Sequence, residues 1–135
     1  MWNKPLAALI CAACAGCSTW APSEKYTIQA PPDAYLVERQ SGDAKVRVIR
    51  DTGATIGTGR MTFSLDGVPT VALNGSEQAD FSTKPGHHIA CAYLTSFMAP
   101  SNKACVETHL DAGEDVALFR MGIAWPDTIK MHREK

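Results

Sequence analysis

The sequence lacks the features that mark several large classes of protein. It has no surplus of positive charge, because 13 Lys and Arg face 14 Asp and Glu, and nucleic-acid phosphates require such a surplus. It has no apolar run of about 20 residues, the length that spans a bilayer as a helix. No nucleotide-binding loop, zinc ribbon or nucleophile motif stands in a usable context. The 135 residues fit one ordinary globular domain, and we expect no nucleic-acid partner.

The first residues are typical of a secretory signal peptide. Lys4 precedes an apolar run of 11 residues, PLAALICAACA at 5–15, and a basic start before a short apolar run marks such a signal. The run is too short for a transmembrane anchor. The next motif, CAGC at 14–17, resembles a bacterial lipobox, in which small residues precede a Cys that receives lipid. Cys14 stands where the usual pattern has Leu, and it is itself a weaker acceptor than Cys17.

This resemblance predicts a lipoprotein signal peptide at 1–16 and lipidation of Cys17. Several acyl chains on one Cys give stable anchoring, where a single chain is marginal. Ser18 follows the Cys, at a position where Asp commonly retains lipoproteins at the inner membrane. The resemblance therefore implies an outer-membrane protein whose domain faces the periplasm. The alternative is a buried apolar helix with incidental cysteines.

Two cysteines, Cys91 and Cys105, remain outside the signal and its junction. An exported protein meets an oxidising compartment, so we expect these two to form a disulfide. A bond closing a loop of about 15 residues stabilises the folded state by about 3 kcal/mol. A reactive redox pair is the alternative, but the body of the chain has no Cys-x-x-Cys spacing.

The residues that flank the predicted domain show no sustained period. We expect a tether at 17–33, which carries three prolines and, if flexible, spans about 22 Å. Trp20 within it would contact either the lipid interface or its own domain. At the other end, residues 131–135 are expected to form a charged, solvated tail. The domain itself is predicted at 34–130.

Alternating apolar and polar residues indicate β-strands in that domain. Residues 45–50 alternate as far as Val48 and residues 61–65 alternate throughout, and further strands are expected at 71–73, 89–93, 106–110 and 116–123. Asp66-Gly67 and Asn74-Gly75 are hairpin signals, because both turn positions need a positive φ. Lys84-Pro85-Gly86 suits a type II turn. No segment has a sustained helical period. The pattern predicts a small antiparallel β-sandwich of about seven strands.

The span from 46 to 89 resembles the PEGA-type sandwich domains and related small bacterial lipoproteins of unknown function. The resemblance lies in a strand before LDG at 65–67, the strand VAL with NG at 71–75, and PGHHI at 85–89. It covers about a third of the chain, and its motifs are turn chemistry. It implies an interaction module of the cell surface or envelope, and it carries no catalytic residues.

Metal and acid–base chemistry find little support in the sequence. His87 and His88 are adjacent, so in a strand they point to opposite faces. A metal set of His88, His109 and Glu107 has looser spacing than zinc sites usually show. Two further carboxylates beside a turn, at 114 and 115, are of the kind that is usually solvated. We therefore assign no metal, no cofactor and no catalytic residue, and we expect the chain not to be an enzyme.

A Gly- and Thr-rich loop at 52–59 is the stretch best suited to recognition. It has no Lys after its last Gly and no following helix, so a phosphate cradle is not expected. Together with the apolar residues of the predicted disulfide loop, it gives a candidate recognition loop made of Thr52, Gly53, Thr55, Gly57, Phe97 and Met98.

The sequence thus predicts a lipid-anchored interaction or assembly module with an envelope protein as partner. The alternative is a module that binds a periplasmic ligand or inhibits a hydrolase. A metal carrier or an enzyme is the weakest of the three hypotheses.

Overall fold

The computed structural model describes residues 26–38, 42–51, 59–95, 103–113, 115–124 and 128–135. These residues form strands and one short 3-10 helix, and none of their helices is long and apolar enough to cross a membrane. In chain order the elements are β1 (Ile28–Gln29), η2 (Pro32–Ala34), β2 (Ala44–Arg50), β3 (Met61–Leu65), β4 (Val68–Leu73), β5 (Glu77–Thr83), β6 (Gly86–Leu94), β7 (Ala104–Leu110), β8 (Val116–Ala124) and β9 (Thr128–Arg133).

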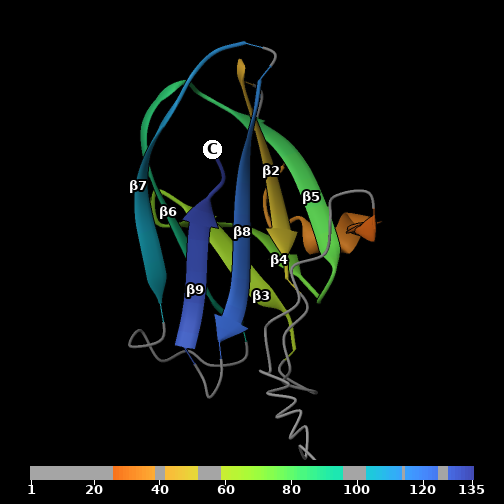
Figure 1. The fold of residues 1–135 in the computed structure, drawn as a ribbon. Coiled ribbons are helices and arrows are strands. Elements are labelled where there is room, and N and C mark those ends of the chain that lie inside the picture. The colour runs from red at the N-terminus through yellow and green to blue at the C-terminus, as the bar shows by residue number, and fades with distance from the viewer. Residues whose placement is uncertain (1–25, 39–41, 52–58, 96–102, 114, 125–127) are drawn as a thin grey trace, which may run out of the picture.

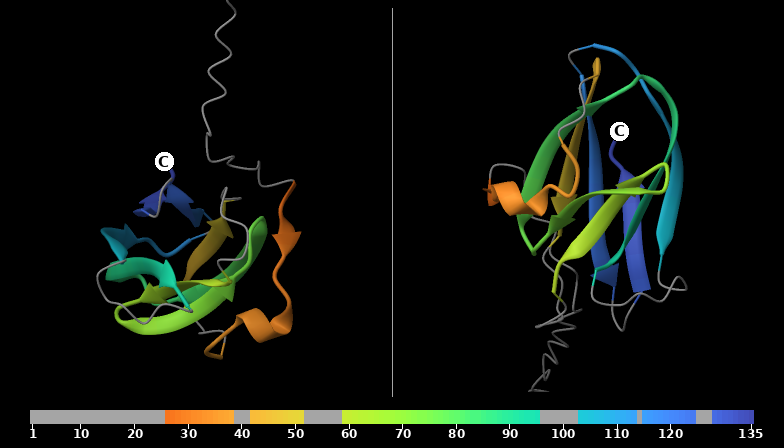
Figure 2. Two further views of the ribbon diagram at one scale, coloured as in Figure 1. Left: turned by 90° about the horizontal axis from the view of Figure 1, so that it is seen from below. Right: turned by 180° about the vertical axis from the view of Figure 1, so that it is seen from behind.

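The strands form two sheets that pack face to face, so the predicted all-β sandwich is confirmed (Figure 1). One sheet has the order β1-β5-β2-β8-β9 and the other has the order β4-β3-β6-β7. Most neighbours run antiparallel, but β1 pairs with β5, and β2 with β8, in parallel. The central strands of the larger sheet therefore come from distant parts of the chain. Figure 2 shows the two layers from below and from behind.

The core lies between the sheets and follows the period-two alternation of the strands. Phe63 of the smaller sheet stands at its centre, with its ring centroid 6.1 Å from Phe81 and 5.4 Å from Phe119 of the larger sheet. Tilted aromatic pairs at these distances are favourable beyond the area that they bury. The other fully buried large side chains include Met61, Leu73, Leu110, Met121, Val46, Val48 and Val71.

The two predicted hairpin turns have different outcomes. Asp66 and Gly67 have φ values of 52° and 80°, and they join β3 to β4 as neighbours in one sheet, as expected. Asn74 and Gly75 do not form a hairpin, because β4 and β5 belong to different sheets. There the positive φ of 63° falls on Ser76, whose N–H donates to the carbonyl of Arg50. This turn carries the chain across the sandwich.

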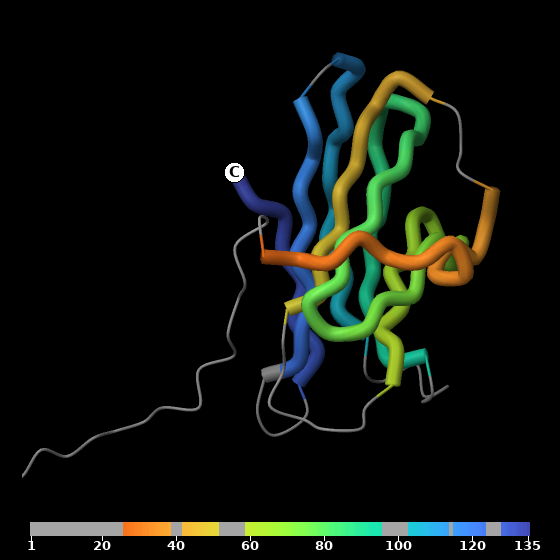
Figure 3. The backbone as a smooth tube through the Cα atoms, turned by 90° about the vertical axis from the view of Figure 1, so that its right-hand side faces the viewer, coloured from red at the N-terminus to blue at the C-terminus, as the bar shows by residue number. Residues whose placement is uncertain are grey.

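The N-terminal described residues cross one open side of the sandwich. The chain from 26 to 36 runs from the edge of the larger sheet to β4, and Figure 3 shows it lying across the strands. Ala30 donates its N–H to Gln78, and Leu36 donates its N–H to Thr70. β1 and the first two residues of η2 fall within the 17–33 span that the sequence assigns to the tether. The chain that joins Cys17 to the folded domain is therefore shorter than expected.

The opposite side of the sandwich is closed by β9, which replaces most of the expected charged tail. Residues 131–133 pair with β8, and the N–H of Glu134 donates to the carbonyl of Leu118 at 2.8 Å. Arg133 then reaches across to β7. Its Nη1 donates to Thr108 Oγ1 at 2.8 Å and to the carbonyl of His109 at 2.6 Å. Residues 132–135 are exposed, as a charged and solvated tail requires, but pairing with β8 and the contacts to β7 hold 131–133 in a strand.

Candidate functional site

Most of the predicted site residues lie outside the described residues and stay predictions: Cys17, Thr52, Gly53, Thr55, Gly57, Phe97 and Met98. The residues that flank the segments 52–58 and 96–102 are described, and two of them meet at one end of the sandwich. The N–H of Thr95 donates to the carbonyl of Arg60 at 2.9 Å. The segment 96–102 therefore begins beside the place where 52–58 ends, although about 35 residues separate the two in sequence.

The expected disulfide between Cys91 and Cys105 is present. The two residues face each other directly across β6 and β7, with their Cα atoms 4.1 Å apart. Cys91 is buried and Cys105 is exposed. The bond ties together the strands on both sides of 96–102, so it fixes the position from which that segment leaves the sheet.

Hydrogen bonds hold the residues on both sides of the other predicted recognition segment, 52–58. Arg50 is buried, and its Nη1 donates to the carbonyl of Gly59 at 2.5 Å and to that of Leu73 at 2.8 Å. Burial lowers the pKa of Arg50, and the charge of Glu77 opposes that shift. On the other side, Asp51 is held by its N–H to the Met121 carbonyl. The sequence could not reveal these contacts, because they depend on strands that are distant in the chain.

Among the described residues, the most buried charge network lies next to this segment. Arg120 on β8, with only 8% of its side chain exposed, pairs with Asp51 at 2.9 Å and with Glu134 at 2.5 Å. Burial raises the pKa of Asp51, despite its hydrogen bond and charge interaction with Arg120. For Arg120, burial lowers the pKa, but the two carboxylates outweigh it and the pKa is raised. A Cβ on Gly122 would lie 3.3 Å from Asp51, so the Gly leaves room for that carboxylate.

Three of the four histidines, His87, His88 and His109, are engaged with protein groups at the other end of the sandwich. Both ring nitrogens of His88 are 2.6 Å from acceptors, which are Asp66 Oδ2 and the carbonyl of Lys84. Burial acts to raise the pKa of Asp66, but the Ile89 N–H and His88 outweigh it and hold this pKa below its usual value. These contacts tie His88, a residue of β6, to Asp66 in the turn between β3 and β4.

His109, the second histidine of the metal set considered from the sequence, is not the cross-strand partner of His88. It pairs in register with His87, the two rings meeting edge to face at 5.5 Å, and its Nε2 is 3.3 Å from Asp111. Among the residues that the structure describes, no group of three or more His, Cys, Asp or Glu is arranged to hold a metal ion. The set of His88, His109 and Glu107 is therefore not brought together as a site.

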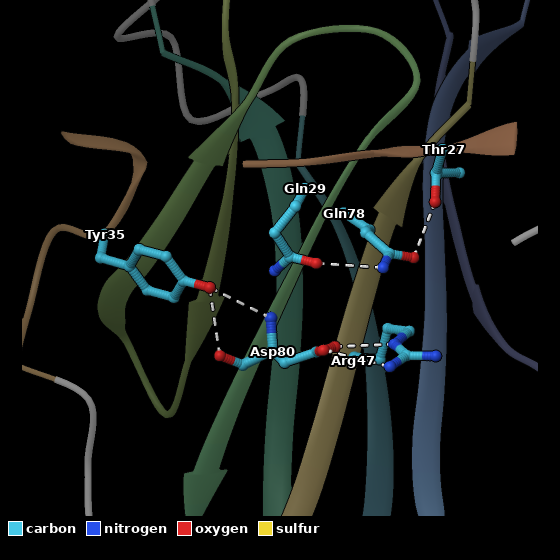
Figure 4. A network of polar contacts seen from close by, with 6 residues as sticks. All are labelled: Thr27, Gln29, Tyr35, Arg47, Gln78 and Asp80. Carbon is cyan, nitrogen blue, oxygen red and sulfur yellow. Dashed lines mark hydrogen bonds and ion pairs between the residues drawn. The ribbon is translucent and has the colours of Figure 1, made fainter. Parts of the chain in front are cut away.

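The outer face of the larger sheet carries a polar network (Figure 4). Arg47 on β2 makes a two-pronged ion pair with Asp80 on β5, at 2.7 and 3.1 Å. The Tyr35 hydroxyl donates to the Asp80 carbonyl and accepts from the Asp80 N–H, both at 3.2 Å. The Tyr35 hydroxyl thus bonds to the backbone N–H and carbonyl of Asp80, at a part of β5 where β1 no longer pairs with it. Bare backbone groups at a sheet edge invite pairing with another chain, so this contact protects the edge.

Two shallow hollows adjoin this network and share Lys45 and Val116 in their linings. The larger, of about 390 Å³, lies along β2 and β5 with Arg47 and Ser82 in its lining. The smaller, of about 180 Å³, lies by the β7–β8 turn and includes Arg133. The larger volume lies at the lower end of the range of ligand pockets, about 300–1,000 Å³, and the smaller volume lies below that range. They can accept a polar group at the surface.

These features define the chain as a small two-sheet β-sandwich with a cross-strand disulfide and firmly held loop ends. A scan against protein-family models, a search of curated proteins and a search of solved structures each found no match. The resemblance to PEGA-type domains therefore stays a prediction.

Proposed function

We propose that this chain is a lipid-anchored protein of the bacterial envelope, which acts as a non-enzymatic interaction or assembly module at the periplasmic face of the outer membrane. The observation that carries the proposal is the disulfide between Cys91 and Cys105. Disulfides persist in oxidising compartments and are rare in the cytosol. The bond therefore supports export, which is what the signal-like residues 1–16 and the lipobox-like motif ending at Cys17 predict.

The choice of an interaction role is supported by the way in which the loop ends are held. Binding residues are often found on loops that a rigid scaffold positions. Here Arg50, Arg120 and the disulfide hold the strands on which the segments 52–58 and 96–102 begin and end. A firm base lowers the entropy that a loop loses when it binds a partner.

The lipid anchor is tested by two Cys-to-Ala variants. Wild-type protein extracted from membranes should carry an acyl mass on Cys17 and should begin at that residue. Cys17→Ala should lose the mass and leave the membrane fraction, while Cys14→Ala should keep both. A wild-type N-terminus without lipid, or membrane attachment that persists in Cys17→Ala, would show the anchor to be wrong.

The partner is tested by crosslinking in cells, followed by mass spectrometry of the captured proteins. One dominant envelope protein, lost when residues 52–58 are replaced by a Gly-Ser linker of equal length, supports the assembly role. Crosslinks spread over abundant neighbours, or capture unchanged by the linker, would contradict it.

A ligand-binding or hydrolase-inhibiting module is a second candidate, favoured by the two adjoining hollows around Lys45. It predicts that cell-wall fragments or a periplasmic hydrolase stabilise the purified protein, and that Lys45→Ala removes the effect. Lys130→Ala, a change on β9 at a residue that lines neither hollow, is the matched control. Equal stabilisation of both variants would reject this candidate.

A further inference from the structure

Two apolar side chains, one just before β1 and one within it, are highly exposed. Tyr26 and Ile28 are 65% and 67% exposed, the highest values among the large hydrophobic residues that the structure describes. Thr27 and Gln29 alternate with them and bond to Gln78, at 2.7 and 3.1 Å. Ile28 lies between Thr27 and Gln29, and because successive side chains of an extended chain point to opposite sides, its side chain faces away from these bonds. Tyr26 precedes β1 on the same exposed segment.

These two residues lie at the start of the folded domain, close to the predicted anchor. Eight residues, 18–25, separate Cys17 from Tyr26. A flexible chain of that length has a root-mean-square span of about 16 Å, and a fully extended one reaches about 30 Å. A lipid on Cys17 would thus keep Tyr26 and Ile28 within reach of the bilayer surface.

The backbone of β1 is held firmly on the domain. The N–H of Ile28 donates to the Ser76 carbonyl at 2.8 Å, and that of Ala30 donates to the Gln78 carbonyl at 2.8 Å. A contact made by the side chains of β1 would therefore orient the whole sandwich. Figures 1 and 2 show the segment that starts at Tyr26 on one side of the sandwich, with β7 and β9 on the other.

We propose that Tyr26 and Ile28 insert into the interfacial layer of the bilayer that holds the Cys17 lipid, and so dock the β1 side of the sandwich on the membrane. This inference rests on the lipid anchor of the proposed function. Tyr is enriched at membrane interfaces, where its ring lies in the apolar part and its hydroxyl reaches water. Burial of the Ile side chain is favoured by the hydrophobic effect. Docking directs β7 and β9 away from the membrane.

The test uses the full lipidated protein in vesicles of phosphatidylethanolamine and phosphatidylglycerol. The variant Ile28→Cys offers one free thiol for an environment-sensitive fluorophore, because Cys91 and Cys105 are paired. Lys130→Cys, on the exposed face of β9, is the matched control. We expect lipid-borne quenchers to act about threefold or more strongly on the label at 28 than on the label at 130, since only the former lies in the interface.

A second pair of variants separates docking from simple proximity. With the label at Tyr26→Cys, the added change Ile28→Ser should lower the quenching about twofold, because it removes apolar surface from the contact. Ile89→Ser, a change at a half-exposed Ile of the other sheet, should leave the quenching unchanged. Circular dichroism confirms that each variant is folded.

The outcomes distinguish this inference from the proposed function. Equal quenching at 28 and 130, on protein whose mass shows the Cys17 lipid, would overturn the docking and leave the anchor in place. Equal effects of Ile28→Ser and Ile89→Ser would also overturn it. A mature chain without lipid on Cys17 would overturn the proposed function, and the docking with it.

Discussion

Arg120→Met should destabilise the domain far more than the same change in an exposed ion pair. Arg120 is the shared partner of Asp51, whose side chain is 16% exposed, and of Glu134, whose side chain is 39% exposed. Removing one member of a buried ion pair leaves the other charge without compensation and lowers the free energy of unfolding by about 3–5 kcal/mol. Because both carboxylates are partly exposed, we expect a loss of about 3 kcal/mol here. Arg47→Met is the control. Its pair with Asp80 is more exposed, so the loss should stay below about 1 kcal/mol.

The assay is urea unfolding followed by far-ultraviolet circular dichroism at pH 7. A loss of this size shifts the midpoint by about 2 M, for a slope near 1.5 kcal/mol per M. The double variant Asp51→Asn with Arg120→Met should recover half of the loss or more, because no buried carboxylate is then left alone.

The pH dependence of the same variant gives a further check. Burial already raises the pKa of Asp51, so its charged form opposes folding, and stability falls as the pH rises through the folded-state pKa. Without Arg120 the charged form of Asp51 opposes folding more strongly. The loss of unfolding free energy in Arg120→Met should therefore shrink as the pH is lowered toward the pKa of Asp51. Equal losses in Arg120→Met and Arg47→Met, or a double variant as unstable as the single one, would refute the reasoning.

Three further changes are expected to have distinct effects. Cys91→Ser with Cys105→Ser should lower the free energy of unfolding by about 3 kcal/mol, and wild-type protein in reductant should show the same urea midpoint. Because the pKa of Asp66 is lowered, its charge contributes stability above its ordinary pKa that is lost as the pH falls through the folded-state pKa. Asn also tolerates a positive φ, so Asp66→Asn removes the charge and keeps the turn. Between pH 5 and 3 its melting temperature should fall less than that of the wild type, and an equal fall would contradict the assignment. Gly67→Ala meets open space at a φ of +80°, so it should cost about 1–2 kcal/mol through backbone strain alone, whereas Gly67→Asn should cost less.

Features decided by neighbouring residues could be predicted from the sequence. The Asp66-Gly67 hairpin follows from the positive φ that both positions require, and the alternating strands at 45–50 and 61–65 follow from their period. The disulfide could be predicted because only two cysteines remain outside the signal. Each of these inferences needs only local residues or a count, and the structure has all three features.

Features decided by distant partners could not be predicted in the same way. The Asn74-Gly75 turn resembles a hairpin locally, but β5 finds its neighbour in β2, so the chain crosses between sheets. The contact of Asp51 with Arg120 joins residues 69 positions apart, and neither has a local signal. Residues 131–133 are polar enough for a tail, and they become a strand because the edge of β8 is available to them.

The parallel pairing of β2 with β8 sets the order in which the domain can be completed. Lys45 pairs with Val116, so the central strand of the larger sheet lacks one neighbour until most of the chain is present. Pairings of such long range slow folding, because a large loop must close before the contact forms. A chain that ends before β8 would therefore not be a smaller version of this domain. It would expose β2 as an open edge, which favours aggregation, so loss of the residues from Val116 onward leaves the larger sheet without two of its strands.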